Sequence, residues 1–128
     1  MKASELMIGD WVYDTLSQTN IKVNRGCFEI NPLNGICYAE NLIPIPLTKE
    51  IFEKNGFEKL RESRFLLEDL EDNYWVKFYP KDTNYTCGAY DYIDIDCGCL
   101  SIREMPIKFV HELQNALRLC GITREIIV

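Results

Sequence analysis

The chain has 128 residues, 47% of them hydrophobic and 27% charged, which is the usage of a soluble globular domain. Twenty acidic residues against fourteen basic ones give a net charge of −6. These values argue against long disorder, a coiled coil and a membrane-spanning helix. The length predicts a single domain over 1–128, with a β-rich part at 1–45 and an α+β part at 46–128.

The β-rich part predicts short strands joined by tight turns. Trp11-Val12-Tyr13 is an apolar strand, and Ile21 and Val23 alternate with polar neighbours, as in a half-buried strand. Asn34-Gly35 is a strong signal for chain reversal. Further strands are expected at 27–30 and 36–38. We expect an SH3-like or otherwise curled N-terminal sheet.

The first helix is predicted over 48–55. Thr48 occupies the N-cap position, where its hydroxyl can accept a hydrogen bond from a free backbone N–H. Gly56 supplies the left-handed residue that follows many helices, and Phe57 can then pack back on Phe52.

Residues 57–103 predict strands again. Segments 64–70 and 74–79 flank Glu71-Asp72-Asn73, which is typical of a hairpin turn. Further strands are expected at 85–89, 92–97 and 99–103.

The second helix is predicted over 107–120. Pro106 suits the start of a helix, and Gly121 suits its end. The apolar residues between them repeat with a helical period, at Phe109, Val110, Leu113, Ala116, Leu117 and Cys120. Residues 126–128 are expected to dock as a terminal strand or to fill a gap. The fold class is therefore α+β, with antiparallel strands and two helices.

The six cysteines are expected to be free thiols. We see no secretory signal, which predicts a cytoplasmic protein in a reducing compartment. Zinc sites usually show paired Cys-x-x-Cys spacing, and the nearest pattern here is Cys97-Gly98-Cys99. We expect no metal and no cofactor. The cysteines are Cys27, Cys37, Cys87, Cys97, Cys99 and Cys120.

His111, Gln114 and Asn115 form a polar patch beside the apolar face of the second helix. A histidine can act as a general base, and Asp94 or Asp96 could serve as its partner in a small hydrolase or nuclease. The favoured interpretation is structural, with these side chains docking on loop backbone. We assign no catalytic residue and expect a protein that is not an enzyme.

Residues 90–96 alternate in the manner of an amphipathic strand. Tyr92, Asp94 and Asp96 share one face, where two carboxylates could hold Mg²⁺ or Ca²⁺. The favoured interpretation leaves these carboxylates in water. Tyr90 and Tyr92 belong to an aromatic-rich half of the chain, and exposed aromatic residues suit a protein interface.

Two segments concentrate the acidic residues. Segment 62–72 has five acids and one base, and segment 82–96 has four acids and no base, so each has a net charge of −4. Phosphate binding needs clustered Lys and Arg, and no such cluster is present. We expect a protein partner, with no direct binding to nucleic acid or membrane. An alternative is an acidic decoy that occupies the basic cleft of a DNA-binding protein.

Three segments carry a resemblance to a known family: Glu5 to Val12, Ile43 to Glu50 leading to Asn55-Gly56-Phe57, and Phe109-Val110-His111-Glu112-Leu113-Gln114-Asn115. Together they resemble a group of small bacterial proteins without assigned activity, often linked to prophages or other mobile elements. The resemblance implies an accessory protein of a phage or mobile element and supplies no catalytic residues.

Overall fold

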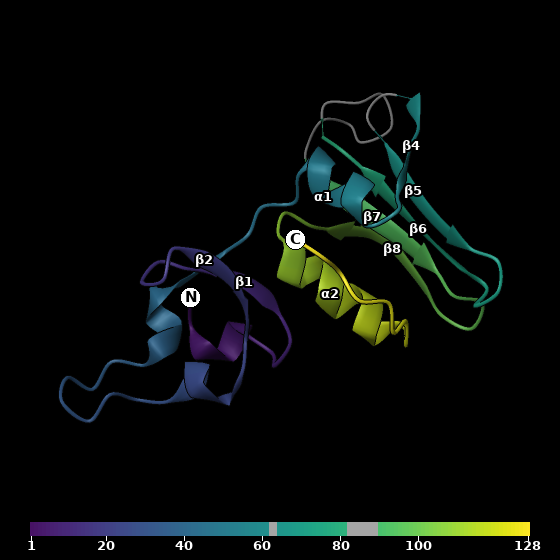
Figure 1. The fold of residues 1–128 in the computed structure, drawn as a ribbon. Helices are drawn as coiled ribbons and strands as arrows, with labels where there is room; N and C mark the ends of the chain where they lie inside the picture. Colours follow the sequence, from purple (N-terminus) through teal and green to yellow (C-terminus); the bar gives the residue numbers. More distant parts are fainter. Residues whose placement is uncertain (62–63, 82–89) are drawn as a thin grey trace.

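The computed structural model describes residues 1–61, 64–81 and 90–128. It has two antiparallel sheets and two α-helices, which confirms the α+β class (Figure 1). The helices are α1 (Lys49–Lys54) and α2 (Val110–Leu119). No helix in the described ranges is long and apolar enough to cross a membrane. The predicted strand at 85–89 and Cys87 lie outside the described residues.

The N-terminal sheet has the strand order β2-β1-β3, with β1 at Trp11–Asp14, β2 at Thr19–Lys22 and β3 at Leu42–Pro44. Two expected strands are instead 3₁₀ helices, at Arg25–Phe28 and Tyr38–Asn41. The side chain of Asn24 accepts a hydrogen bond from the Gly26 N–H and favours the first of these turns. The helices close a small core made by Leu6, Val12, Val23, Cys27, Ala39 and Leu42.

The second sheet is a meander in which each strand pairs with the next along the chain. Its strands are β4 (Glu58–Lys59), β5 (Phe65–Asp69), β6 (Tyr74–Tyr79), β7 (Tyr92–Asp96) and β8 (Ser101–Pro106). The predicted hairpin between β5 and β6 is confirmed, and Asn73 takes the left-handed conformation that its turn requires.

The capping signals predicted for the first helix are confirmed in α1. The Thr48 hydroxyl accepts a hydrogen bond from the Ile51 N–H at 3.3 Å. Gly56 has a φ of 83°, and the Phe57 N–H donates to the Phe52 carbonyl at 3.0 Å. The rings of Phe52 and Phe57 are 5.1 Å apart. This is the closing turn that a glycine after a helix makes possible.

Helix α2 begins three residues later than predicted, because Pro106 closes β8 instead of opening the helix. The chain between them stays extended, where the Ile107 N–H donates to the Asp91 carbonyl at 3.1 Å. Glu112 then caps the helix by accepting hydrogen bonds from the Lys108 and Phe109 N–H groups, both at 2.9 Å.

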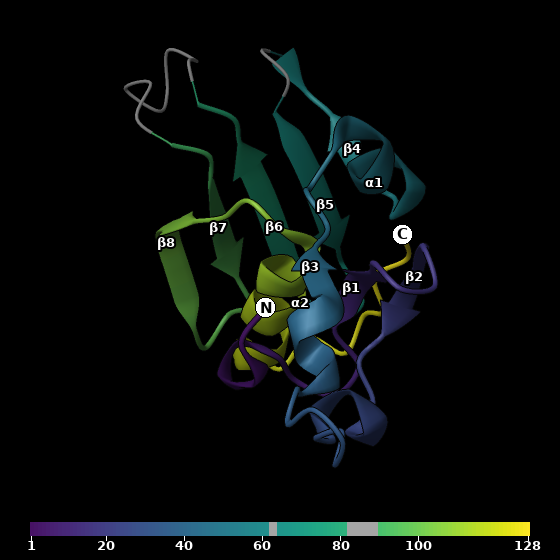
Figure 2. The same cartoon turned by 90° about the vertical axis from the view of Figure 1, so that its left-hand side faces the viewer.

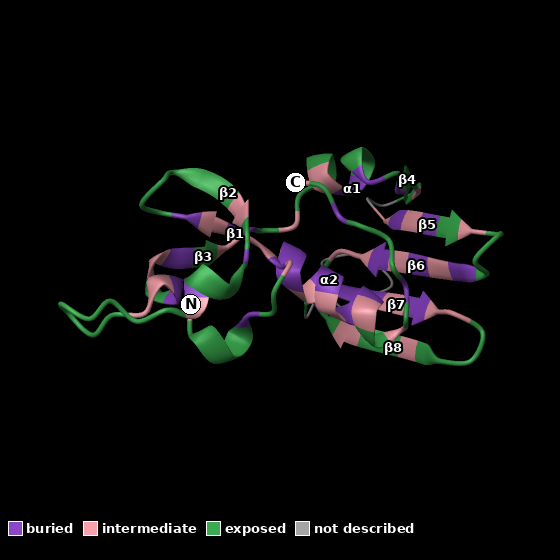
Figure 3. Ribbon diagram, turned by 60° about the horizontal axis from the view of Figure 1, so that its bottom comes forward, coloured by how far each residue is buried: buried purple, intermediate pink, exposed green. Residues whose placement is uncertain are grey.

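Helix α2 lies between the two sheets (Figures 1 and 2). Its apolar side joins α1 and one face of the five-stranded sheet in the main core. Buried and half-buried residues alternate along β6, as expected for a sheet with one covered face (Figure 3). The C-terminal residues fill a gap rather than forming a strand, and Ile126 is buried in the same core.

Candidate functional site

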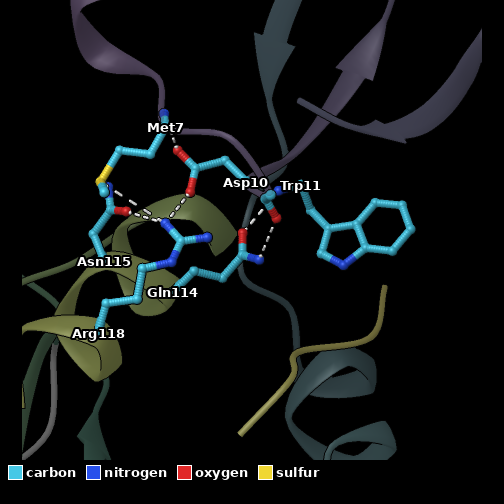
Figure 4. A network of polar contacts seen from close by, with 7 residues as sticks. Met7, Asp10, Trp11, Gln114, Asn115 and Arg118 are labelled. Atoms are coloured by element: carbon cyan, nitrogen blue, oxygen red, sulfur yellow. Dashed lines mark hydrogen bonds and ion pairs between the residues drawn. The ribbon is translucent and has the colours of Figure 1, made fainter. Parts of the chain in front are cut away.

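A network of polar side chains joins the N-terminal sheet to α2 (Figure 4). Asp10 is fully buried and accepts hydrogen bonds from the Arg118 guanidinium at 2.6 Å and from the Met7 N–H at 2.8 Å. The predicted binding residue Gln114 accepts from the Trp11 N–H at 2.8 Å and donates to the Gly9 carbonyl at 3.1 Å. This network, which we call the junction, holds the two sheets together.

The polar patch predicted on α2 therefore contributes mainly to the junction. Asn115 accepts a hydrogen bond from Arg118 at 2.7 Å. His111 is buried and lies 5.9 Å from the ring of Phe109, centroid to centroid. Among the described residues, its Nδ1 atom has no hydrogen-bond partner.

The structure does not bring His111 together with the two aspartates proposed as its partners. Ile93 and Ile95 point into the core that α2 covers. Asp94 and Asp96 alternate with them, so their carboxylates lie on the opposite face of the sheet. A general base needs its partner within hydrogen-bond reach or one water away.

The face of the five-stranded sheet that points away from both helices is the second concentration of functional side chains. The strand register places Trp75 opposite Asp96, Lys77 opposite Asp94 and Tyr79 opposite Tyr92. This confirms that Tyr92, Asp94 and Asp96 share one face. We call this surface the outer sheet face; it consists of Leu66, Glu68, Trp75, Lys77, Tyr79, Tyr92, Asp94, Asp96 and Arg103.

Two cations lie over the ring of Trp75 on this face. The Lys77 ammonium is 4.9 Å from the indole centroid, and the Arg103 guanidinium is 5.0 Å from it. Arg103 also pairs with Asp96 at 3.4 Å. The Gly98 N–H, the Ser101 hydroxyl and Arg103 hold the pKa of the Asp96 carboxyl below its usual value. Both cations therefore restrict the indole.

A second aromatic group lies further along the same face. The rings of Tyr79 and Tyr92 stack at 4.7 Å, and Tyr90 packs edge-on against Tyr92 at 6.2 Å. The Arg64 guanidinium lies 5.9 Å from the Tyr79 ring. Burial and the charge of Asp94 raise the pKa of the Tyr79 phenol. Of the two predicted tyrosines, Tyr90 is exposed, whereas Tyr92 is buried and supports the ring of Tyr79.

The edges of the sheet are poor sites for adding a strand. Edge strand β4 has only two residues. Edge strand β8 is interrupted by a bulge opposite Ile93 and Ile95, where Glu104 has a φ of 53°, and it ends at Pro106. Bulges and prolines are devices that block edge-to-edge pairing. Both edges of the sheet are therefore protected against pairing with a further strand.

The acidic segments separate into two places. Asp69, Asp72 and Asp96 lie at the end of the sheet formed by the β5–β6 and β7–β8 hairpins, which we call the hairpin end. Asp91 lies at the other end of β7 and accepts a hydrogen bond from the Lys81 N–H at 2.6 Å. Across the described ranges, no group of three or more His, Cys, Asp or Glu side chains could hold a metal ion.

Comparison of the chain with family models, with curated proteins and with solved structures finds no match. The function of the chain is therefore inferred from the geometry of the site. Sequence reasoning missed Trp75, Lys77 and Arg103. The alternation of β6 could have placed Trp75 and Lys77 together with Tyr79, but the contact with Arg103 depends on the pairing of β6, β7 and β8.

Proposed function

We propose that this chain is a non-enzymatic accessory protein of a phage or mobile element that acts by binding another protein. The docking surface is the outer sheet face. The observation that carries this proposal is the set of Trp75, Tyr79 and Arg103 on one face that neither helix covers, with Tyr79 stacked on the buried Tyr92 ring. Trp, Tyr and Arg are the residue types most enriched among binding hot spots.

The fixed geometry of these side chains supports the proposal. Ordering a mobile side chain on binding costs about 0.5–1.5 kcal/mol. The two cations near Trp75 and the stack of Tyr79 on Tyr92 restrict those rings before any partner arrives. Most of the free-energy cost of ordering these side chains is thus already met in the free protein.

The charges on this face favour a protein over a nucleic acid. Carboxylates alternate with the cations along it, so a polyanion would meet an acidic group beside each basic one. Among the described residues, Lys77 has no carboxylate partner within ion-pair distance. The partner is a protein whose apolar patch covers Trp75 and whose own carboxylate pairs with Lys77.

The test begins with capture from a bacterial lysate at low and at physiological salt, with the captured protein identified by mass spectrometry. That protein is then purified, and its affinity is measured for the wild type and two variants. Trp75→Ala is expected to weaken binding by about 30-fold or more, since hot-spot truncations cost about 2 kcal/mol. Lys77→Glu is expected to weaken it as well and to be rescued by reversing the facing carboxylate of the partner.

Matched controls lie elsewhere on the surface. Leu33 is 94% exposed in an N-terminal loop, and Lys54 is exposed on α1. Leu33→Ala and Lys54→Glu should bind as the wild type does. Equal affinity of wild type, Trp75→Ala and Lys77→Glu would contradict the proposal, as would capture of nothing beyond a second copy of this chain. Urea unfolding of each variant separates lost binding from lost folding.

The acidic decoy is a second candidate, favoured by the carboxylates of Asp69, Asp72 and Asp96 at the hairpin end. A decoy would capture a DNA-binding protein, and the capture would weaken as salt rises. It would also be lost in the double variant Asp69→Asn/Asp72→Asn and retained in Trp75→Ala. The two candidates thus predict opposite responses to the same variants.

A further inference from the structure

Three cysteine side chains line one open cavity of about 470 Å³. Cys97 follows β7, Cys99 lies two residues further in the β7–β8 turn, and Cys120 lies at the C-terminal end of α2. Asp69, Tyr74 and Thr123 complete part of its wall. Thiols from two distant parts of the chain therefore converge on a space that solvent can enter.

Cys97 and Cys120 differ from Cys99 in their surroundings. Both line the cavity and pack against the main core, whereas Cys99 is exposed. The Cys97 thiol also donates a hydrogen bond to the Leu100 carbonyl at 3.3 Å. Both side chains are partly buried against the main core, which limits how far each can move away from the other.

We propose that Cys97 and Cys120 form a redox-active pair that a peroxide converts to an intramolecular disulfide. Disulfides that form in a reducing compartment are usually transient and redox-responsive. The opening of the cavity admits the oxidant, and the neighbouring thiol resolves the first oxidation product. This site is separate from the docking surface and does not depend on the proposed function.

The reaction proceeds in two balanced steps. The Cys97 thiolate attacks one oxygen of the peroxide and breaks the O–O bond, giving a sulfenic acid and, with hydrogen peroxide, one water. The Cys120 sulfur then attacks the sulfenic sulfur and displaces the hydroxyl as a second water. Two thiols lose two protons and two electrons, and the peroxide takes up both.

The order of the two cysteines follows from their surroundings. Burial and the Cys97 thiol raise the pKa of the Cys120 thiol, so less of it is thiolate at neutral pH. Cys120 is thus the poorer first nucleophile. Because Cys120 lines the same cavity as Cys97, its thiol can react directly with a sulfenic acid formed on Cys97. Cys120 is therefore the resolving thiol.

The chain contains its own comparison pair in Cys27 and Cys37. The Cys37 thiol donates to the backbone carbonyl of Cys27 at 3.4 Å, and Cys27 is buried in the small N-terminal core. Like the proposed pair, these two cysteines lie close together, but Cys27 is buried and, in the described part of the chain, does not line an open cavity with Cys37.

The test treats the reduced protein with hydrogen peroxide in the presence of a chelator, then blocks free thiols with N-ethylmaleimide under denaturing conditions. Trypsin leaves Cys87, Cys97 and Cys99 in peptide 82–103 and Cys120 in peptide 119–124. We expect these two peptides to become linked, with loss of about 2 Da relative to their summed masses. The link should disappear with dithiothreitol.

Serine variants assign the link, since one peptide contains three cysteines. Cys97→Ser and Cys120→Ser should abolish it, while Cys99→Ser and Cys87→Ser should retain it. Cys27 should react fully with N-ethylmaleimide after the same treatment. The oxidised wild type should also melt several degrees higher than the reduced form, as expected when a cross-link closes a loop.

Several results would overturn the proposal. A link that survives in Cys97→Ser would assign the chemistry to Cys99 or Cys87. Cys120 that alkylates as completely as Cys27 after oxidation would show that no pair exists. Disulfides found only between two chains would place the reactive thiol at the exposed Cys99. Far-UV circular dichroism of Cys120→Ser, with Cys120→Ala as a second variant, separates each result from a failure to fold.

Discussion

The junction and the outer sheet face use similar side chains for different ends. In the junction, Asp10, Gln114 and Arg118 direct their polar atoms at the chain's own backbone and at each other. On the outer sheet face, Lys77 and Arg103 flank an aromatic ring that neither helix covers. Polar groups that satisfy buried backbone maintain the fold, whereas polar groups around an uncovered ring are available to a partner.

The largest loss of stability is expected when the buried charge of the junction is removed. Asp10→Ala leaves the Met7 N–H without its acceptor and removes the carboxylate that pairs with Arg118, so we expect the free energy of unfolding to fall by about 3 kcal/mol. Urea denaturation measures it. Glu53, which pairs with Lys49 on the surface of α1, is the matched control, and Glu53→Ala should cost no more than about 0.5 kcal/mol. Equal losses in both variants would contradict the assigned role of Asp10.

A smaller loss is expected from the amide of the junction. Gln114→Ala leaves the Trp11 N–H and the Gly9 carbonyl unpaired, which should lower the free energy of unfolding by about 2 kcal/mol. Its neighbour Asn115 is only partly buried and accepts one bond, from Arg118. Asn115→Ala should therefore cost less than half as much in the same urea experiment. The reverse order would mean that Gln114 is not the main polar contact between the sheets.

The smallest predicted effect concerns the outer sheet face. Arg103→Gln removes a positive charge beside Asp96, so the pKa of that carboxyl should rise slightly toward its ordinary value. The shift stays small because the Gly98 N–H, which contributes most, remains in place. A carboxyl NMR titration follows it, and the urea midpoint should hardly change. A large loss of stability would make Arg103 a structural residue like Arg118.

The sequence predicts local elements of this fold well. Thr48, Gly56 and the turn at Glu71–Asn73 act through neighbours a few residues away, so their signals can be read without the fold. Pro106 misleads because a proline suits both the start of a helix and the end of an edge strand. Which of these applies depends on the pairing of β8 with β7, which no local pattern contains.

The candidate site could be predicted only in part for the same reason. Period-2 alternation gives the shared face of Tyr92, Asp94 and Asp96. The contact between Trp75 and Arg103 needs three paired strands and a bulge. The contact between Asp10 and Arg118 joins residues 108 positions apart. Such contacts follow from topology, which no local pattern in the sequence reveals.

The docked C-terminal residues have a consequence for how the protein is made. The Trp11 indole N–H donates to the Ile126 carbonyl at 2.7 Å across a separation of 115 residues, and Asn55 exchanges two hydrogen bonds with Ile127. A ribosome releases Ile126 and Ile127 long after the N-terminal sheet has emerged. Trp11 therefore emerges 115 residues before the carbonyl to which its indole N–H donates. Long-range contacts of this kind also slow folding.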